Sequence, residues 1–233
     1  MIRRAFVLLL LLALGAIFLD LLLGFVPATE LNETARYYAE RSAADLGTAN
    51  ITTAIIVTYR GLDTLGEVTV LFLTAAIVGL VLSWGRRSAE GPQRQLLPTG
   101  ELLTTGKNLL VPLILLLGVY VFVNGHLTPG GGFQGGAILA SGILLMLLTD
   151  PMKRFSHGMI SAVESFSGLV FVGLGLLGVA LAGGFLDNRL LPIGTVGELF
   201  SAGVIPIIYS FIGLKVGAEF SSMLVNLSET EDS

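Results

Sequence analysis

Glu67 stands at the point where a long apolar run begins, and it is one of the few carboxylates beside such a run in this sequence. It closes the string RGLDTLGE at residues 60–67, in which Asp63 is a second carboxylate. A carboxylate there can cap a helix, because it faces unpaired N–H groups and the positive end of the helix dipole. At membrane depth, a carboxylate is costly and tends to mark a path for protons or cations. Glu67 and Asp63 are therefore candidates for an ion or proton path, with helix capping as the alternative.

Lys215 and Glu219 lie four residues apart in the last apolar stretch, so they project from nearly the same face of a helix. An unpaired lysine at the centre of a membrane helix costs roughly 2.5–3.5 kcal/mol. Lys215 should therefore face the protein interior, with Glu219 as its nearest candidate partner. The pair is either a structural one near a membrane surface, with the lysine snorkelling, or part of a polar path for charge. Gly213 and Gly217 form a small-xxx-small pattern that permits close helix packing.

The most distinctive string is rich in glycine and connects two apolar stretches. It formally contains a G-x-G-x-x-G match, but a dinucleotide fingerprint needs a preceding strand in a soluble βαβ unit, so we reject nucleotide binding. Glycines at this density allow backbone with positive φ and very close approach of a neighbouring chain. We expect a tight turn that enters a helix, with a flexible hairpin as the alternative. The string comprises Thr128, Pro129, Gly130, Gly131, Gly132, Phe133, Gln134, Gly135 and Gly136.

Four further titratable residues are weaker candidates for a functional role. Asp20 comes late in the first apolar stretch, and Glu164 stands where the fifth begins and could cap it. His126 follows the third stretch and would titrate near neutrality if it were exposed, although a loop histidine is usually just solvated. The other histidine, His157, is far from it in sequence, so we expect no dedicated metal centre.

The composition predicts an all-α integral membrane protein. Of its 233 residues, 53% are hydrophobic and only 13% are charged, and the mean hydropathy is +0.84. Soluble domains usually carry about 25% charged residues, so this chain cannot cover a globular surface with polar groups. It has no cysteine, which excludes disulfides and the usual ligands of iron–sulfur clusters. The net charge of -4 without a basic cluster argues against nucleic acid as a partner. We expect no cofactor, no metal and no enzymatic catalysis within the chain.

Six apolar stretches approach the length of about 20 residues that a membrane-spanning helix needs. The third and fourth are short, so we expect their ends to be shielded by protein or to lie in the interface. The first exceeds the apolar core of a signal peptide, and we expect a retained helix. The six stretches are Ala5–Phe25, Val68–Trp84, Leu109–Val123, Phe133–Thr149, Ser165–Leu186 and Leu199–Val225.

The basic residues predict the orientation. With the N-terminus inside, eight of them lie in cytoplasmic segments and four in external loops, which satisfies the positive-inside tendency. We therefore expect a multi-pass protein of the plasma membrane with both termini in the cytoplasm. The cytoplasmic set is Arg3, Arg4, Arg86, Arg87, Arg94, Lys107, Lys153 and Arg154, and the external set is Arg36, Arg41, Arg60 and Arg189.

Changes in composition predict two modules. The polar, Pro- and Gly-containing stretch 85–103 is typical of a cytoplasmic linker. It separates a two-helix front module, residues 1–84, from a four-helix back module, residues 104–227. The acidic tail 228–233 is expected to be disordered. Within the long external segment, residues 48–60 are apolar but too short to span a membrane, and they could form a re-entrant segment or an interfacial helix.

Two of these strings together resemble a known family. TPGGGFQGG at residues 128–136 resembles the signature of the B subunit (MnhB) of Mrp, or Mnh, multisubunit cation/proton antiporters, and IGLKVG at 212–217 resembles that family's last helix. The front part, with YRGLDTLGEVTV at 59–70, is similar to the C-terminal extension of the large antiporter polypeptide, MnhA. It is equally similar to the small E-type protein that replaces this extension in Mrp-like membrane-bound hydrogenases.

The resemblance implies an accessory component of a large membrane assembly, with other subunits and the lipid bilayer as partners and Na⁺ or H⁺ as transported ions. In the family, the carboxylate at the position of Glu67 is implicated in ion or proton transfer. The leading hypothesis is a subunit of a cation/proton antiporter, with Glu67, Lys215 and Glu219 along part of the ion route. The alternatives are the sodium-translocating membrane arm of a respiratory complex such as a hydrogenase, and a scaffold that moves no ion. For the glycine string, the resemblance favours subunit packing over ligand binding.

Overall fold

The computed structural model describes residues 2–27, 29–88, 100–150 and 155–231, and these residues form helices joined by loops, without a strand. This confirms the all-α prediction. The chain divides into two compact units, Met1–Arg36 and Tyr37–Ser233. The elements in order are α1 (Ile2–Leu23), α2 (Glu33–Leu46), α3 (Ile51–Thr53), the π-helix η1 (Ala54–Tyr59), α4 (Gly61–Ser88), α5 (Glu101–Val123), α6 (Gly132–Thr149), α7 (His157–Leu181), the 3-10 helix η2 (Asn188–Leu190) and α8 (Ile205–Glu231).

Six of these helices are long and apolar enough to cross a membrane, as predicted: α1, α4, α5, α6, α7 and α8. Their bounds differ from the predicted ones. The third span was expected to be short but is the 23-residue α5, because the helix continues through the polar turns 101–108. The fourth, α6, is short, with 18 residues. The fifth begins at His157, where Ser156 accepts a hydrogen bond from the Met159 N–H as an N-cap.

Helix α1 belongs to the first compact unit and is apolar on all sides, which is typical of a membrane span. Its described side chains are exposed. Asp20 lies in its last turn, as the sequence predicted.

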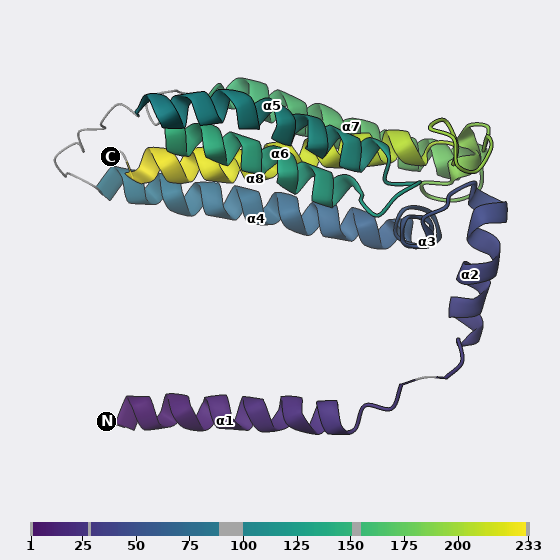
Figure 1. The fold of residues 1–233 in the computed structure, drawn as a ribbon, viewed down its shortest axis with the longest axis horizontal. Helices are drawn as coiled ribbons and strands as arrows, with labels where there is room; N and C mark the ends of the chain where they lie inside the picture. Colours follow the sequence, from purple (N-terminus) through teal and green to yellow (C-terminus); the bar gives the residue numbers. More distant parts are fainter. Residues whose placement is uncertain (1, 28, 89–99, 151–154, 232–233) are drawn as a thin grey trace. The chain divides into compact units, whose positions relative to one another are not determined.

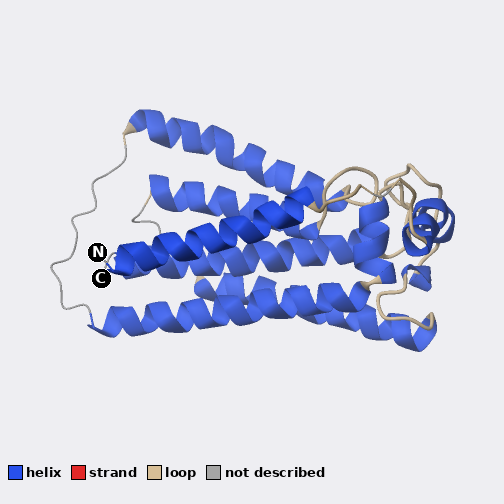
Figure 2. Cartoon of the chain, turned by 90° about the horizontal axis from the view of Figure 1, so that it is seen from below, coloured by secondary structure: helices blue, strands red, loops and turns tan. Residues whose placement is uncertain are grey.

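In the second unit, five long helices lie side by side and alternate in direction, as Figure 1 shows. Helix α8 is in the middle: α4, α5, α6 and α7 all pack against it, and α6 also packs against α5. A view turned by 90° shows the same roughly parallel axes (Figure 2). The loops between α4 and α5 and between α6 and α7 lie at the end of the bundle that holds the C-terminus, whereas the loops that follow α5 and α7 lie at the opposite end.

Glycines permit the close packing around α8. A Cβ atom on Gly136 of α6 would lie 2.7 Å from the Gly213 carbonyl oxygen and 2.9 Å from the Gly217 nitrogen. The two glycines that the sequence identified on α8 therefore receive α6 at backbone contact. Because backbone atoms cannot move aside as a flexible side chain can, this approach requires glycine on α6.

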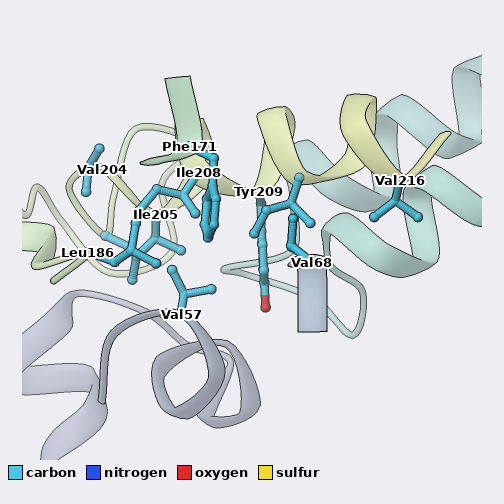
Figure 3. Close-up of a cluster of buried hydrophobic side chains, with 11 residues drawn as sticks. Val57, Val68, Phe171, Leu186, Val204, Ile205, Ile208, Tyr209 and Val216 are labelled. Atoms are coloured by element: carbon cyan, nitrogen blue, oxygen red, sulfur yellow. The ribbon is translucent and has the colours of Figure 1, made fainter. Parts of the chain in front are cut away.

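The main hydrophobic core lies toward the loop end of the bundle, where the segments after α2 and α7 fold over α8. Figure 3 shows its side chains gathered around the start of α8, with Leu186 and Val57 contributed from outside the long helices. The core includes Val57, Val68, Phe171, Leu186, Ala202, Val204, Ile205, Ile208, Tyr209, Ile212 and Val216. Helix α8 itself begins beside this core, and Pro206 fits its first turn because no N–H donor is needed there.

Two predicted boundaries are corrected by these elements. Helix α4 continues to Ser88 and α5 begins at Glu101, so the predicted linker 85–103 is helical at both ends, and its part 89–99 lies outside the described residues. The acidic tail was expected to be disordered, but α8 continues to Glu231, and 232–233 lie outside the described residues. Hydrogen bonds within the last turns, such as Thr230 Oγ1 to the Asn226 carbonyl at 2.8 Å, extend the helix.

The compact units do not follow the boundary between the front and back modules. Helix α4 comes from the front module, but it packs against α8 of the back module within the second unit. The apolar face of α4 provides the reason, because Val68 is buried in the same core as Tyr209 and Val216 of α8.

Candidate functional site

The two charged residues predicted on the last helix form an ion pair inside the bundle. Lys215 Nζ lies 2.8 Å from Glu219 Oε1, and the two side chains are 10% and 0% exposed. The i, i+4 spacing on α8 brings them together, as the sequence predicted. Since a buried ion pair costs several kcal/mol of desolvation per ion, its position in the bundle is informative. The second carboxylate oxygen, Glu219 Oε2, is buried without a hydrogen-bond partner among the described residues.

Neighbouring helices enclose this pair. The ring of Phe72 on α4 lies 5.1 Å from Lys215 Nζ, within the range of a cation–π interaction. On the α7 side, the absence of a side chain at Gly168 makes room for the lysine, because a Cβ there would lie 3.5 Å from Nζ. Glu164, also on α7, interacts electrostatically with Glu219. Glu164 is the eighth residue of α7 and not its cap, which corrects the sequence-based expectation.

Glu67 is also deeper in its helix than the capping interpretation requires. Helix α4 begins at Gly61, so Glu67 is its seventh residue and the first turn holds Asp63 instead. The capping alternative for Glu67 is therefore wrong. The Glu67 side chain is exposed on this chain and acts electrostatically on Tyr209 of α8. Phe72 lies five residues further along α4, which corresponds to a rise of about 7.5 Å, so Glu67 and the Lys215–Glu219 pair occupy successive levels of the same α4–α8 interface.

Asp63 is separated from these groups by its own partner. It forms an exposed ion pair with Arg60, one turn earlier in the chain. Such surface pairs contribute little to stability. The structure therefore brings together Lys215, Glu219 and Glu164, places Glu67 along the same interface, and leaves Asp63 at its end.

The glycine string does not form a ligand site; it seats α8. Gly131 has a φ of 150°, and a Cβ there would contact the Tyr209 ring, while a Cβ on Gly132 would lie 2.5 Å from Ile212 Cγ2. The tight turn into a helix is confirmed, since α6 begins at Gly132. The close contacts described here are within the chain, whereas the resemblance suggested packing between subunits.

A segment that could have been re-entrant closes the loop end of the bundle. Residues 51–59 form two short helices, α3 and η1, and the residues around them bind the loop after α5. Thr48 Oγ1 donates to the His126 carbonyl at 2.6 Å, Asn50 Nδ2 donates to the carbonyls of Gly125 and Thr128, and Thr53 Oγ1 donates to Gly125. We call residues 46–53 the strap. It ties the front module to the start of the glycine string.

His126 lies beneath this strap. Its side chain is fully buried, which corrects the expectation of a solvated loop histidine. Burial lowers the pKa of the ring, because the charged form loses its hydration, although nearby backbone groups of Val123 and Glu198 partly oppose this. His126 is therefore a neutral structural residue at neutral pH.

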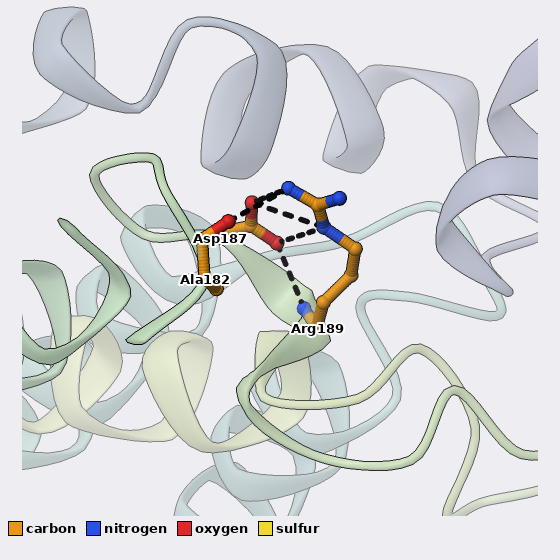
Figure 4. Close-up of polar contacts among 3 residues, drawn as sticks. All are labelled: Ala182, Asp187 and Arg189. Carbon is orange, nitrogen blue, oxygen red and sulfur yellow. Dashed lines mark hydrogen bonds and ion pairs between the residues drawn. The ribbon is translucent and has the colours of Figure 1, made fainter. Parts of the chain in front are cut away.

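Two polar clusters stabilise the surrounding loops. Asp187 Oδ1 accepts hydrogen bonds at 2.9 Å from both the backbone nitrogen and Nε of Arg189, and Arg189 also donates to the Ala182 carbonyl (Figure 4). These bonds hold the pKa of the Asp187 carboxyl below its usual range. On the other side of the strap, Tyr38 stacks on Tyr59 at 4.9 Å, and burial raises the pKa of Tyr59. Both clusters are structural.

Sequence reasoning missed the polar contacts that the strap and α8 make. Thr53 and Tyr209 carry no motif, and their hydrogen bond of 3.2 Å joins residues 156 positions apart. Only the proximity of Tyr209 to the glycine string in space, which no sequence pattern encodes, reveals this connection.

Comparisons with known proteins agree with this architecture. The chain is 38% identical to a chain of the membrane-bound sulfane sulfur reductase, an archaeal respiratory membrane complex, with a TM-score of 0.82 over 97% of this chain and 98% of that one. It is 26% identical to a chain of the Mrp complex from a Dietzia species, with a TM-score of 0.77 over 97% of this chain and 26% of that one. A probable K⁺/H⁺ antiporter protein of Rhizobium meliloti, in which the A and B components are one polypeptide, is 29% identical over 70% of this chain and 20% of its own length.

Six spanning helices and these relatives define a multi-pass membrane subunit of an Mrp-type complex. Residues 102–222, more than half of the chain, match a family described as a domain related to the MnhB subunit of Na⁺/H⁺ antiporter. The chain belongs to this MnhB-related family. Residues 2–95 match a second family, MbhE, a subunit of MBH. The chain spans only about a fifth of the Rhizobium relative and about a quarter of the Dietzia chain.

Proposed function

We propose that this subunit contributes charged groups to ion or proton translocation in an Mrp-type membrane complex. The observation that carries the proposal is the imbalance of charge along the α4, α7 and α8 interface. Three carboxylates, Glu67, Glu164 and Glu219, share a single ammonium group, Lys215, within candidate membrane spans. Since excess charge at low dielectric is costly, such groups take up protons or cations. Exchange of a proton or a cation is what a translocation path requires.

Within this interface, the roles follow from burial. Glu67 is exposed on the isolated chain, so it is available to a partner subunit or to an ion that passes along the surface of α4. Lys215 and Glu219 are enclosed and 2.8 Å apart, so they can change protonation without contact with bulk solvent. In this arrangement Glu67 exchanges the ion with the partner, and the buried pair responds through its charge.

We propose two hosts for this activity. The first is a cation/proton antiporter, in agreement with the names of the Rhizobium relative and the Dietzia complex. The second is a respiratory membrane complex, and it is favoured by the higher identity, 38% over nearly the whole of both chains, to a chain of the sulfane sulfur reductase. In both hosts we propose the plasma membrane as the location, with both termini in the cytoplasm.

The test is cation-dependent proton flux in inverted membrane vesicles that contain the whole complex. Glu67→Gln removes the charge and keeps the shape, so we expect flux to fall while the complex assembles normally on a native gel. Glu40→Gln, at an exposed position of α2, is the matched control and should leave flux unchanged. Unchanged flux with Glu67→Gln, Lys215→Met and Glu219→Gln alike would leave a scaffold as the better description.

A further inference from the structure

Helix α7 carries a polar stripe toward the end of the bundle at which α8 ends. His157, Ser161, Glu164 and Gly168 follow the spacing i, i+4, i+7 and i+11, which places them on one helix face. The rest of the helix beyond Gly168 is apolar apart from its glycines. A span that is polar in one half only presents polar groups from that end to a fixed depth.

The antiparallel pairing of α7 with α8 fixes what this stripe faces. His157 Nε2 lies 2.7 Å from Glu229 Oε1, Ile160 packs in one cluster with Val225, and Gly168 lies against Lys215. Because the two helices are in register at both ends of the stripe, Glu164 lies opposite residues 219–222 of α8. The electrostatic interaction between Glu164 and Glu219 agrees with this register.

The buried groups at this level are incompletely satisfied. Glu219 Oε2 and Ser167 Oγ are both buried without a hydrogen-bond partner among the described residues. Ser167 is 1% exposed and Glu219 is 0% exposed, whereas Glu164 is half-buried. An unpaired buried polar atom costs about 1–3 kcal/mol, so a water molecule or a proton between α7 and α8 would relieve both. Glu164 is the carboxylate of this group that remains in contact with the outside of the bundle.

A proton fits this place better than a metal cation. Two carboxylates, Glu164 and Glu219, accompany one ammonium group, so one more positive charge balances the group. The Lys215 ammonium repels a second cation at this distance, and the described residues contain no group of three or more acidic, histidine or cysteine side chains that could hold a metal ion. Helix α6 adds no titratable side chain, and the carboxylates of α4, Asp63 and Glu67, lie toward its other end.

We propose that Glu164 is a proton-exchanging residue that connects the buried Lys215–Glu219 pair with the end of the bundle where His157 meets Glu229. Protonated Glu164 gives its proton to Glu219 Oε2 through a water molecule held by Ser167 Oγ, and Glu164 becomes a carboxylate. It regains a proton from solvent along the face that carries Ser161 and His157. No electron is transferred, and the proton is the only species that moves. This inference rests on the proposed function, because it extends the same path.

The experiment compares assembled complexes in inverted membrane vesicles. We expect Glu164→Gln to lower cation-dependent proton flux by about 100-fold, the scale of a lost proton-transfer group, with normal assembly on a native gel. Ser165→Ala, at an exposed position next to Glu164, is the control and should leave flux unchanged. Normal flux in assembled Glu164→Gln, alongside lost flux in Glu67→Gln, would overturn this inference and leave the proposed function intact. Normal flux in both would overturn both.

A second variant separates proton exchange from a structural role. Glu164→Asp keeps the carboxyl group but shortens it, so we expect assembly, partial flux and a displaced pH profile of flux. Difference infrared spectra of the purified complex should show a carboxylic acid band that responds to pH and is missing in Glu164→Gln. An unchanged pH profile in Glu164→Asp together with an unchanged infrared band in Glu164→Gln would overturn the proposal, even if Glu164→Gln failed to assemble in vesicles.

Discussion

The Tyr209 hydroxyl on α8 donates a hydrogen bond of 3.2 Å to Thr53 Oγ1, and so connects two regions that match different families. Thr53 in turn donates to the Gly125 carbonyl at 2.6 Å. The bond is buried, and the Tyr209 ring rests against the glycine string. The MbhE-like and MnhB-like parts are thus locked together at the end of the bundle formed by the loops.

This connection predicts a measurable loss of stability. A buried hydrogen bond contributes about 1 kcal/mol, so Tyr209→Phe should lower the thermal stability of the detergent-solubilised complex. Thr53→Val should cost more, because it also removes the bond to Gly125. Thr53→Ser keeps both bonds and is the control. Additive effects of Tyr209→Phe and Thr53→Val in a double-mutant cycle would contradict the coupling.

The contact between α6 and α8 predicts that Gly136→Ala is harmful. The new Cβ would lie 2.7 Å from the Gly213 carbonyl oxygen, so the helices must separate at a cost of about 1–3 kcal/mol. Gly173→Ala on α7 meets nothing within 4 Å and should be neutral or stabilising by about 0.5–1 kcal/mol. Thermal unfolding of both variants in detergent checks this. Equal stability of the two would show that the close approach is not needed.

The buried ion pair predicts an asymmetric result. Lys215→Met leaves the Glu219 charge unpaired inside the bundle, which should cost about 3–5 kcal/mol. The double variant with Lys215→Met and Glu219→Gln removes the unpaired charge, so it should regain most of the stability but no transport. The amount of assembled complex on a native gel and the proton flux are the two measurements. A double variant as unstable as Lys215→Met would mean that the pair is not isolated as described.

His126 predicts a dependence of stability on pH. Its folded pKa is lowered by burial, so below the unfolded value of about 6.5 the unfolded chain binds more protons than the folded one. Stability is therefore lost as the pH falls from about 6.5 toward the lower folded pKa. His126→Gln should weaken this acid-side loss in thermal unfolding between about pH 7 and 5.

Thr48→Val provides the comparison for His126. It removes the hydrogen bond to the His126 carbonyl without touching the ring that titrates. We expect lower stability at every pH with the same slope as the parent. If His126→Gln retained the parent's slope as well, another group would be responsible for the acid sensitivity.

The Asp187–Arg189 pair predicts a local effect. Asp187→Asn keeps an acceptor for the Arg189 backbone nitrogen but loses the charge, and since Arg189 is 64% exposed, the expected cost is at most about 1 kcal/mol. Hydrogen–deuterium exchange should become faster in residues 182–190 while the rest of the bundle is unchanged. Asp187→Ala, which also loses the acceptor, should have a larger effect. Equal exchange in both variants would contradict the role of the charge.

The sequence determined the membrane class, the six spans and the pairing of Lys215 with Glu219, because hydropathy and helical spacing are local properties. It also predicted the glycine turn before α6, since glycine density alone indicates tight backbone. Local patterns could not place the ends of the helices, because caps and polar turns such as 101–108 continue a helix beyond its apolar residues.

Only the tertiary structure decided which residues meet. The strap's contact with the loop after α5, the burial of His126 and the position of Glu164 opposite the Lys215–Glu219 pair all depend on packing between segments far apart in the chain. The physical reason is that burial and electrostatic environment are properties of a three-dimensional neighbourhood. A histidine in a loop or a glutamate early in a helix has the same local sequence signal whether the fold buries it or leaves it in solvent.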